Sequence, residues 1–246
     1  MLYGNESISA YTRSNITIWM AMAFQAGAIN IGGFMACHRF VSHVTGFATF
    51  FGLELVQSDW TRALGMLFVP LFFLLGAMVS AQFVDIQLRS RRKPRYFLVF
   101  AILSLILFSV VIGGHNQLFG EFGQALEQSG DYLLLALLCL VCGMQNALVT
   151  TVSRSVIRTT HLTGITTDLG IGLARVLNRG KLARATDEDV HANLMRIGII
   201  FFFGLGSVLG GLLFAQLGYL GFLLPAIISG ALCSGMVYFQ KIRVPK

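Results

Sequence analysis

The sequence is poor in charge. Only 12% of its residues are Asp, Glu, Lys or Arg, against roughly a quarter in soluble domains. Apolar residues make up 55%, and the mean hydropathy is +0.73. This composition excludes an ordinary soluble protein and indicates an integral membrane protein in contact with the lipid bilayer. Since no stretch is polar enough to form a separate soluble domain, residues 1–246 are predicted to form a single polytopic membrane domain.

Motifs for catalysis and metal binding are also missing. There is no His-Glu-x-x-His, no Gly-x-Ser-x-Gly and no acidic pair within the apolar runs, so the chain is not predicted to be an enzyme. Cys139 and Cys142 are spaced i, i+3, but no histidine or further cysteine pair supports a zinc site, and buried small side chains are the favoured interpretation. We expect no metal and no cofactor. The first residues lack a basic region or cleavage pattern, so no removable signal peptide is expected.

What the chain does have is a series of apolar runs. Two of them are short, Phe40–Val56 and His161–Leu177, and each is about 25 Å long as a helix against a hydrocarbon core near 30 Å. The other runs are long enough to span a membrane and are predicted at residues 17–37, 61–84, 96–113, 132–152, 194–216 and 220–240.

The two short runs carry the same motif. His43 and His161 each begin the pattern His-x-Thr-Gly-x-x-Thr-x-x-Gly, and a Gly-x-x-Asn run precedes each copy, ending at Asn30 and Asn146. Matching residues in register at two places indicate an internal duplication. We predict repeat one over about residues 17–113 and repeat two over about 132–240.

The basic residues predict the topology, because the net charge of +7 comes from residues that flank the apolar runs and not from a nucleic-acid-binding face. We take the basic loop 89–95 as cytoplasmic. If both short segments cross the membrane, 8 of the 18 basic residues lie inside; if both re-enter, 16 do. This favours re-entry for the second segment, whereas re-entry of the first rests on the repeat and on its length. Both termini are then cytoplasmic.

Re-entry leaves three spans in each repeat, and an odd number makes the repeats inverted. The predicted fold is therefore an all-α membrane protein with two inverted repeats, each with three transmembrane helices and one re-entrant or half-length helix carrying His-x-Thr-Gly. Inverted repeats with broken helices that meet near the midplane are typical of channels and transporters.

The motif has the chemistry of a solute site. We expect the Thr after each His to cap a helix whose free amides face the membrane interior and attract anions or polar groups. Glycine after it allows a ligand to approach closely. The alternative is that Thr, Gly and His serve helix packing, as we infer for Gly206 and Gly210. The predicted substrate-binding residues are His43, Thr45, Gly46, Thr49, His161, Thr163, Gly164, Thr167, Asn30 and Asn146.

Three charged residues lie close to the motifs. Arg39 and Arg158 could guide an anionic solute to the mouths, or could anchor to lipid headgroups. Asp168 breaks the symmetry of the repeat, because Phe50 holds its place in the first copy. It could couple transport to a proton, or pair with Arg175 or a nearby Thr.

These observations favour a transporter or channel for a small polar or anionic solute that passes between two opposed half-helix N-termini near the midplane. The alternative is a non-transporting scaffold or sensor that binds a partner protein through the polar loop 178–193, and an intramembrane enzyme is less favoured. Assembly as a homo-oligomer is expected by analogy with small inverted-repeat pores. No nucleic-acid partner is expected.

The runs Gly143-Met144-Gln145-Asn146 and Arg158-Thr159-Thr160-His161-Leu162-Thr163-Gly164, with their counterparts in the first half, resemble the YoaK-like family of bacterial multi-pass membrane proteins. The resemblance covers roughly residues 17–240. It implies about six spans and a bacterial inner-membrane location. Since that family has no assigned function, the resemblance implies no substrate.

Overall fold

A computed structural model describes residues 13–124, 129–152, 162–178 and 187–242, and these residues form helices joined by short connections without a β-strand. The helices are α1 (Arg13–Cys37), α2 (Val44–Val56), α3 (Trp60–Phe83), α4 (Asp85–Arg89), α5 (Tyr96–His115), α6 (Ser129–Val152), α7 (Leu162–Leu177), α8 (Asp187–Leu217), the 3₁₀ turn η2 (Gly218–Phe222), α9 (Leu223–Val237) and the π turn η3 (Tyr238–Ile242).

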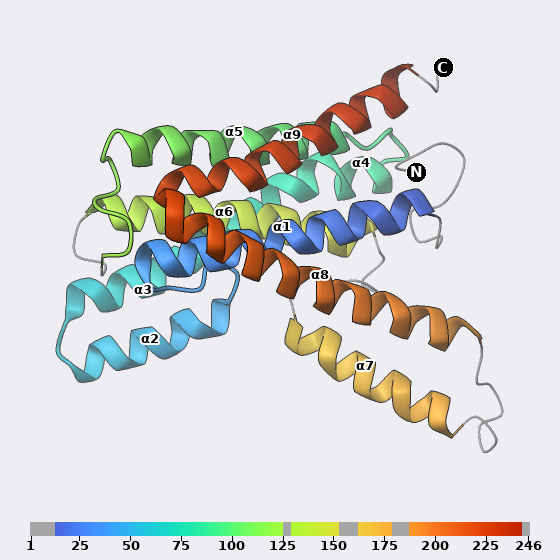
Figure 1. Cartoon of the computed structure of the whole chain (residues 1–246), viewed down its shortest axis with the longest axis horizontal. Helices are drawn as coiled ribbons and strands as arrows, with labels where there is room; N and C mark the ends of the chain where they lie inside the picture. Colours follow the sequence, from blue (N-terminus) through green and yellow to red (C-terminus); the bar gives the residue numbers. More distant parts are fainter. Residues whose placement is uncertain (1–12, 125–128, 153–161, 179–186, 243–246) are drawn as a thin grey trace.

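The long helices have the length and composition of membrane spans. In the described part of the chain, five stretches qualify: 15–37, 60–89, 96–115, 130–152 and 189–240. The last one contains both α8 and α9, which run in opposite directions along the long axis of the molecule (Figure 1). The protein is therefore a multi-pass helical membrane protein, as its composition predicts. The two motif-bearing helices are short, with 13 residues in α2 and 16 in α7, and neither belongs to one of these stretches.

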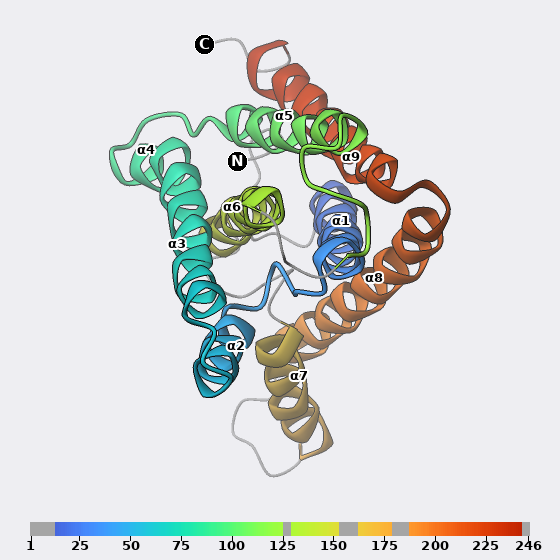
Figure 2. The same cartoon turned by 90° about the vertical axis from the view of Figure 1, so that its left-hand side faces the viewer.

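Each of the main contacts pairs a helix of the first half of the chain with a helix of the second half. The helices α1 and α6 lie in the middle, with α8 packed along α1 and α3 packed along α6 (Figure 2). The pair α5 and α9 covers one side. Each short helix packs on the long helix that follows it, α2 on α3 and α7 on α8.

Glycines bring the main helix pairs into backbone contact. A Cβ atom at Gly27 of α1 would overlap the carbonyl oxygen of Phe203 in α8, and one at Gly206 of α8 would overlap the carbonyl oxygen of Phe24 in α1. The α3–α6 pair is built in the same way: Gly143 of α6 meets the Phe73 carbonyl, and Gly76 of α3 meets the Leu140 carbonyl. Small residues at such crossings allow membrane helices to pack closely. The packing role predicted for Gly206 is confirmed.

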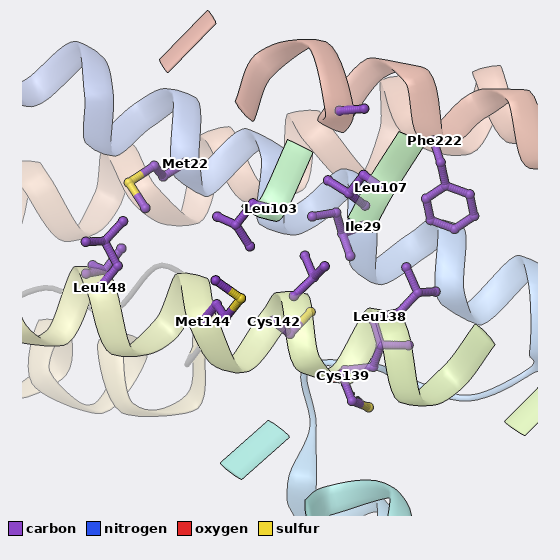
Figure 3. Packing of buried hydrophobic residues seen from close by; sticks show 14 of the residues in the cluster. Met22, Ile29, Leu103, Leu107, Leu138, Cys139, Cys142, Met144, Leu148 and Phe222 are labelled. Atoms are coloured by element: carbon purple, nitrogen blue, oxygen red, sulfur yellow. Dashed lines mark hydrogen bonds between the residues drawn. The ribbon is translucent and has the colours of Figure 1, made fainter. Parts of the chain in front are cut away.

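The core lies between the central helices and α5. Figure 3 shows Ile29 of α1, Leu103 and Leu107 of α5, and Leu138 and Met144 of α6 pointing toward one another, and all five are buried. The cysteines belong to this apolar environment. They are free thiols, and Cys37, Cys139 and Cys142 are fully buried, as predicted for small side chains in apolar runs.

The crossing of α1 and α8 can be tested with two glycines of the same helix. We expect Gly206→Ala to destabilise the protein by about 1–3 kcal/mol, because its methyl group overlaps backbone that cannot move without separating the helices. Gly204 is the control, because a Cβ there meets nothing within 4 Å. Gly204→Ala should leave the stability unchanged or raise it slightly. Thermal unfolding of both variants in detergent measures the difference, and equal melting temperatures would contradict this packing.

Candidate functional site

The two motif-bearing helices occupy opposite halves of the molecule. In Figure 1, α2 begins toward the middle of the long axis and runs to one end, whereas α7 begins toward the middle and runs to the other end. Both lie on the same side of the bundle in Figure 2. At 13 and 16 residues they are about 20 and 24 Å long, which is less than the hydrocarbon core of a bilayer. The N-terminal ends of both helices lie toward the middle of the protein (Figure 1).

His43, and not Thr45, is the residue at which α2 begins. It occupies the N-cap position with φ −114° and ψ 80°, and its side chain forms no capping hydrogen bond. Thr45 is already the second helical residue, and its Oγ1 lies 2.8 Å from Nε2 of His43. The prediction that Thr45 caps the helix is therefore wrong, because the chain turns helical two residues earlier than a cap at Thr45 requires. The His-x-Thr spacing instead closes a hydrogen bond between the two side chains.

The second copy follows the same course where the structure describes it. Its helix α7 contains Thr163 as the second residue, so the prediction that this threonine caps the helix is wrong for the same reason. His161 and Arg158 lie outside the described residues. In both copies the later threonine bonds to the carbonyl of the earlier one: Thr49 to Thr45 at 3.2 Å and Thr167 to Thr163 at 2.9 Å.

The hydroxyl-bearing faces of both helices are exposed. The side chains of Thr45, Thr49, Thr163 and Thr167 are all accessible, as is Asp168, whereas Gly46 and Gly164 are half-buried. Within the described residues Asp168 has no hydrogen-bond or ion-pair partner, and Arg175 is paired with Asp189 at 3.8 Å. The alternative of an Asp168–Arg175 pair is thus not what the structure shows.

The two predicted asparagines are half-buried. Asn30 accepts a hydrogen bond from Ser42 Oγ at 2.8 Å, which ties α1 to the segment that leads into α2. Asn146 also has an interaction partner. Asn30 therefore holds the start of α2 in place, and any contact with a solute would add to that role.

Arg39 is engaged in a buried ion pair. Its Nη2 donates to Glu54 Oε1 at 3.1 Å, and its guanidinium carbon lies 4.1 Å from the centre of the Phe50 ring. The Glu54 side chain is only 6% exposed, and its second oxygen has no hydrogen-bond partner. Because Arg39 precedes α2 and Glu54 lies in its last turns, the pair fixes the helix against the segment that enters it. Guidance of a solute by Arg39 would require this pair to open.

Sequence reasoning missed Glu54, although a signal was present: it is the only acidic residue in the run Phe40–Val56. A carboxylate inside an apolar run requires a partner.

A second missed feature is a buried amide network between three helices. Gln25 of α1 donates to Gln145 Oε1 of α6 at 3.0 Å, Gln145 donates to the Met22 carbonyl at 2.7 Å, and Ser229 of α9 donates to Gln25 Oε1 at 3.1 Å. All three side chains are buried and connected. Amides with their partners in place fix one arrangement of the helices, because any other arrangement leaves buried polar atoms unpaired.

The Arg39–Glu54 pair predicts unequal effects of single and double substitutions. We expect Glu54→Ala to lower the free energy of unfolding by about 3–5 kcal/mol, because it leaves a buried guanidinium unpaired. The double variant Arg39→Met/Glu54→Leu should recover most of that loss, since no charge remains to be buried. Thermal unfolding in detergent tests both.

The control is the Asp85–Arg89 pair, in which the arginine side chain is 77% exposed. Asp85→Asn should cost less than about 1 kcal/mol. A loss for Glu54→Ala no larger than for Asp85→Asn would show that the buried pair does not hold α2.

Comparison with known proteins identifies the family to which the chain belongs. No curated protein and no solved structure matches it. One family model, described as a protein of unknown function (DUF1275), matches residues 18–235, which includes both motif-bearing helices and all the long ones. This agrees with the resemblance to YoaK-like proteins of unassigned function. The chain belongs to the DUF1275 family of proteins of unknown function.

Proposed function

We propose that the protein is a membrane transporter or channel for a small polar or anionic solute, which passes between the N-terminal ends of α2 and α7. The observation that carries this proposal is that two short helices begin toward the middle of the molecule and run to opposite ends (Figure 1). The chain that leads into α2, residues 38–43, is not helical. Such backbone is tolerated at membrane depth where it is buried in protein or lines a wet path.

An inverted repeat explains the pairing of the long helices. If α6 and α8 are the counterparts of α1 and α3, the α1–α8 contact is repeated as the α6–α3 contact. In each contact a glycine meets a backbone carbonyl at the equivalent place: Gly27 meets that of Phe203, and Gly143 meets that of Phe73. We therefore treat residues 17–113 and 132–240 as two inverted repeats, in which α2 and α7 are re-entrant helices that open to opposite sides.

Positive charge supports an orientation in the bacterial inner membrane. The start of α1, the helix α4 and the end of α9 lie at the same end of the molecule (Figure 1). That end carries the basic residues of loop 89–95. We assign it to the cytoplasm, with both termini there. On this assignment α7 opens to the cytoplasm and α2 to the outside.

The exposed polar faces of α2 and α7 line the proposed solute path. Thr49 and Thr167 are exposed residues, and each donates its hydroxyl proton to a carbonyl of its own helix. Asp168 has no partner among the residues that the structure describes, and such a carboxylate would be costly facing lipid. Beside water it is tolerated and could carry a proton along with the solute. A second copy of the chain that covers this face would also keep Asp168 away from lipid. The proposal therefore includes a homo-oligomer. We propose no catalytic role.

Solute flux tests the proposal. We expect purified protein in liposomes to raise the permeability to at least one of formate, acetate, nitrate, glycerol and urea, measured by stopped-flow light scattering. The double variant Thr49→Val/Thr167→Val should lower that flux by about tenfold to thirtyfold, since each hydroxyl contributes on the order of 1 kcal/mol.

Ser234→Ala is the matched control, because Ser234 bonds to the Gly230 carbonyl one turn earlier in the same way, at 3.0 Å, on α9. Its flux should equal that of the wild type. Flux equal to protein-free liposomes for every probe, or equal flux in the threonine variant, would favour a scaffold or sensor that binds a partner protein.

A further inference from the structure

A polar group at the contact between α7 and α8 lies outside the motifs. Arg196 Nη1 donates to Asn193 Oδ1 at 2.8 Å, both residues being on α8. Asn193 is only 4% exposed, and Arg196 is partly buried. An ionised side chain and a buried amide within a membrane helix are expensive unless they serve a purpose or are fully paired.

The pairing is incomplete. Asn193 Nδ2 and Arg196 Nε are both buried, and neither has a hydrogen-bond partner. Both are donors, and the bond between the two residues already uses the amide oxygen of Asn193. Buried donors normally find an acceptor, and leaving one unmet costs about 1–3 kcal/mol. What this group lacks is therefore an acceptor.

The positive charge of Arg196 also indicates that the group lacks an acceptor. Among the described residues Arg196 forms no ion pair. Asp189, about two turns earlier on α8, is paired with Arg175 at 3.8 Å. Within the described residues, the guanidinium of Arg196 thus has no counter-ion, although part of the side chain is buried. An acceptor that also carries negative charge would satisfy both requirements.

Gly172 of α7 packs directly against the group. A Cβ atom at this position would overlap Asn193 Oδ1 and lie 2.9 Å from Arg196 Nη1. The glycine lets α7 pack on α8 while the amide and the guanidinium stay between the two helices. In the first copy of the repeat the corresponding position is Glu54, which supplies a carboxylate from the protein itself.

We propose that Asn193 and Arg196, closed over by Gly172, form a binding site for one oxyanion. The planar Nε–H of arginine and the amide N–H₂ of asparagine are donors suited to a carboxylate or phosphate oxygen. The site takes either a free oxyanion from solution or the phosphate of a lipid headgroup. It does not depend on transport, because binding alone satisfies the two donors.

The test uses the full-length protein in detergent, with potassium phosphate as the probe and potassium chloride at equal ionic strength as the reference. If the site takes a free oxyanion, phosphate raises the melting temperature of the wild type, and the affinity from a titration falls at least tenfold in Arg196→Gln. If it takes a lipid phosphate, free phosphate has no effect, and native mass spectrometry shows a bound phospholipid that Arg196→Gln loses.

Two further variants keep the test informative. Arg196→Lys retains the charge but lacks the Nε donor, so binding should weaken even if Arg196→Gln does not fold. Arg89→Gln removes an arginine of α4 that is 77% exposed and should bind as the wild type does. The proposal is overturned if neither phosphate nor phospholipid binds, or if Arg196→Lys and Arg89→Gln both bind like the wild type. The absence of solute flux in liposomes would not change the outcome of this binding test, because binding of an oxyanion does not require transport.

Discussion

The close approach of α1 to α8 and of α3 to α6 is the contact on which the rest of the structure depends. Each pair joins a helix from one half of the chain to a helix from the other, and at each crossing two glycines face backbone carbonyls. Hydrophobic burial gives no preference between helix and lipid, so close packing must hold these pairs together. The buried bond between Gln25 and Gln145 then fixes how the central helices meet.

This interlocking explains why two short helices lie on one side of the bundle. The long helices bury one another, and α2 and α7 each rest on a single long neighbour, α3 or α8. Their other faces stay exposed and carry threonines at equivalent places. In a bilayer such faces need water, a polar solute or a second protein copy beside them, because hydroxyls and a carboxylate are poorly solvated by lipid. The proposed solute path follows from that requirement.

Much of the fold could be predicted from the sequence because apolar length and charge act locally. The six predicted runs fall within the five candidate membrane-spanning stretches, the last of which contains two of them, and the two short runs gave short helices. The start of α2 could not be predicted, because it depends on the backbone angles of His43 and not on the choice of a capping residue. The partners of Arg39 and Arg196 were also missed, since each is set by how the segments pack. The proposed roles of the threonines remain predictions.

The central claim is that α2 and α7 re-enter from opposite sides of the membrane. Single cysteines at Gln57 and Asn178, in a background without the native four, report this directly, because each residue is exposed just beyond the end of its short helix. A membrane-impermeant thiol reagent applied to intact cells should label position 57 and should reach position 178 only after the membrane is opened. Labelling of both positions from outside would mean that α7 crosses the membrane, and it would contradict the inverted arrangement and the solute path built on it.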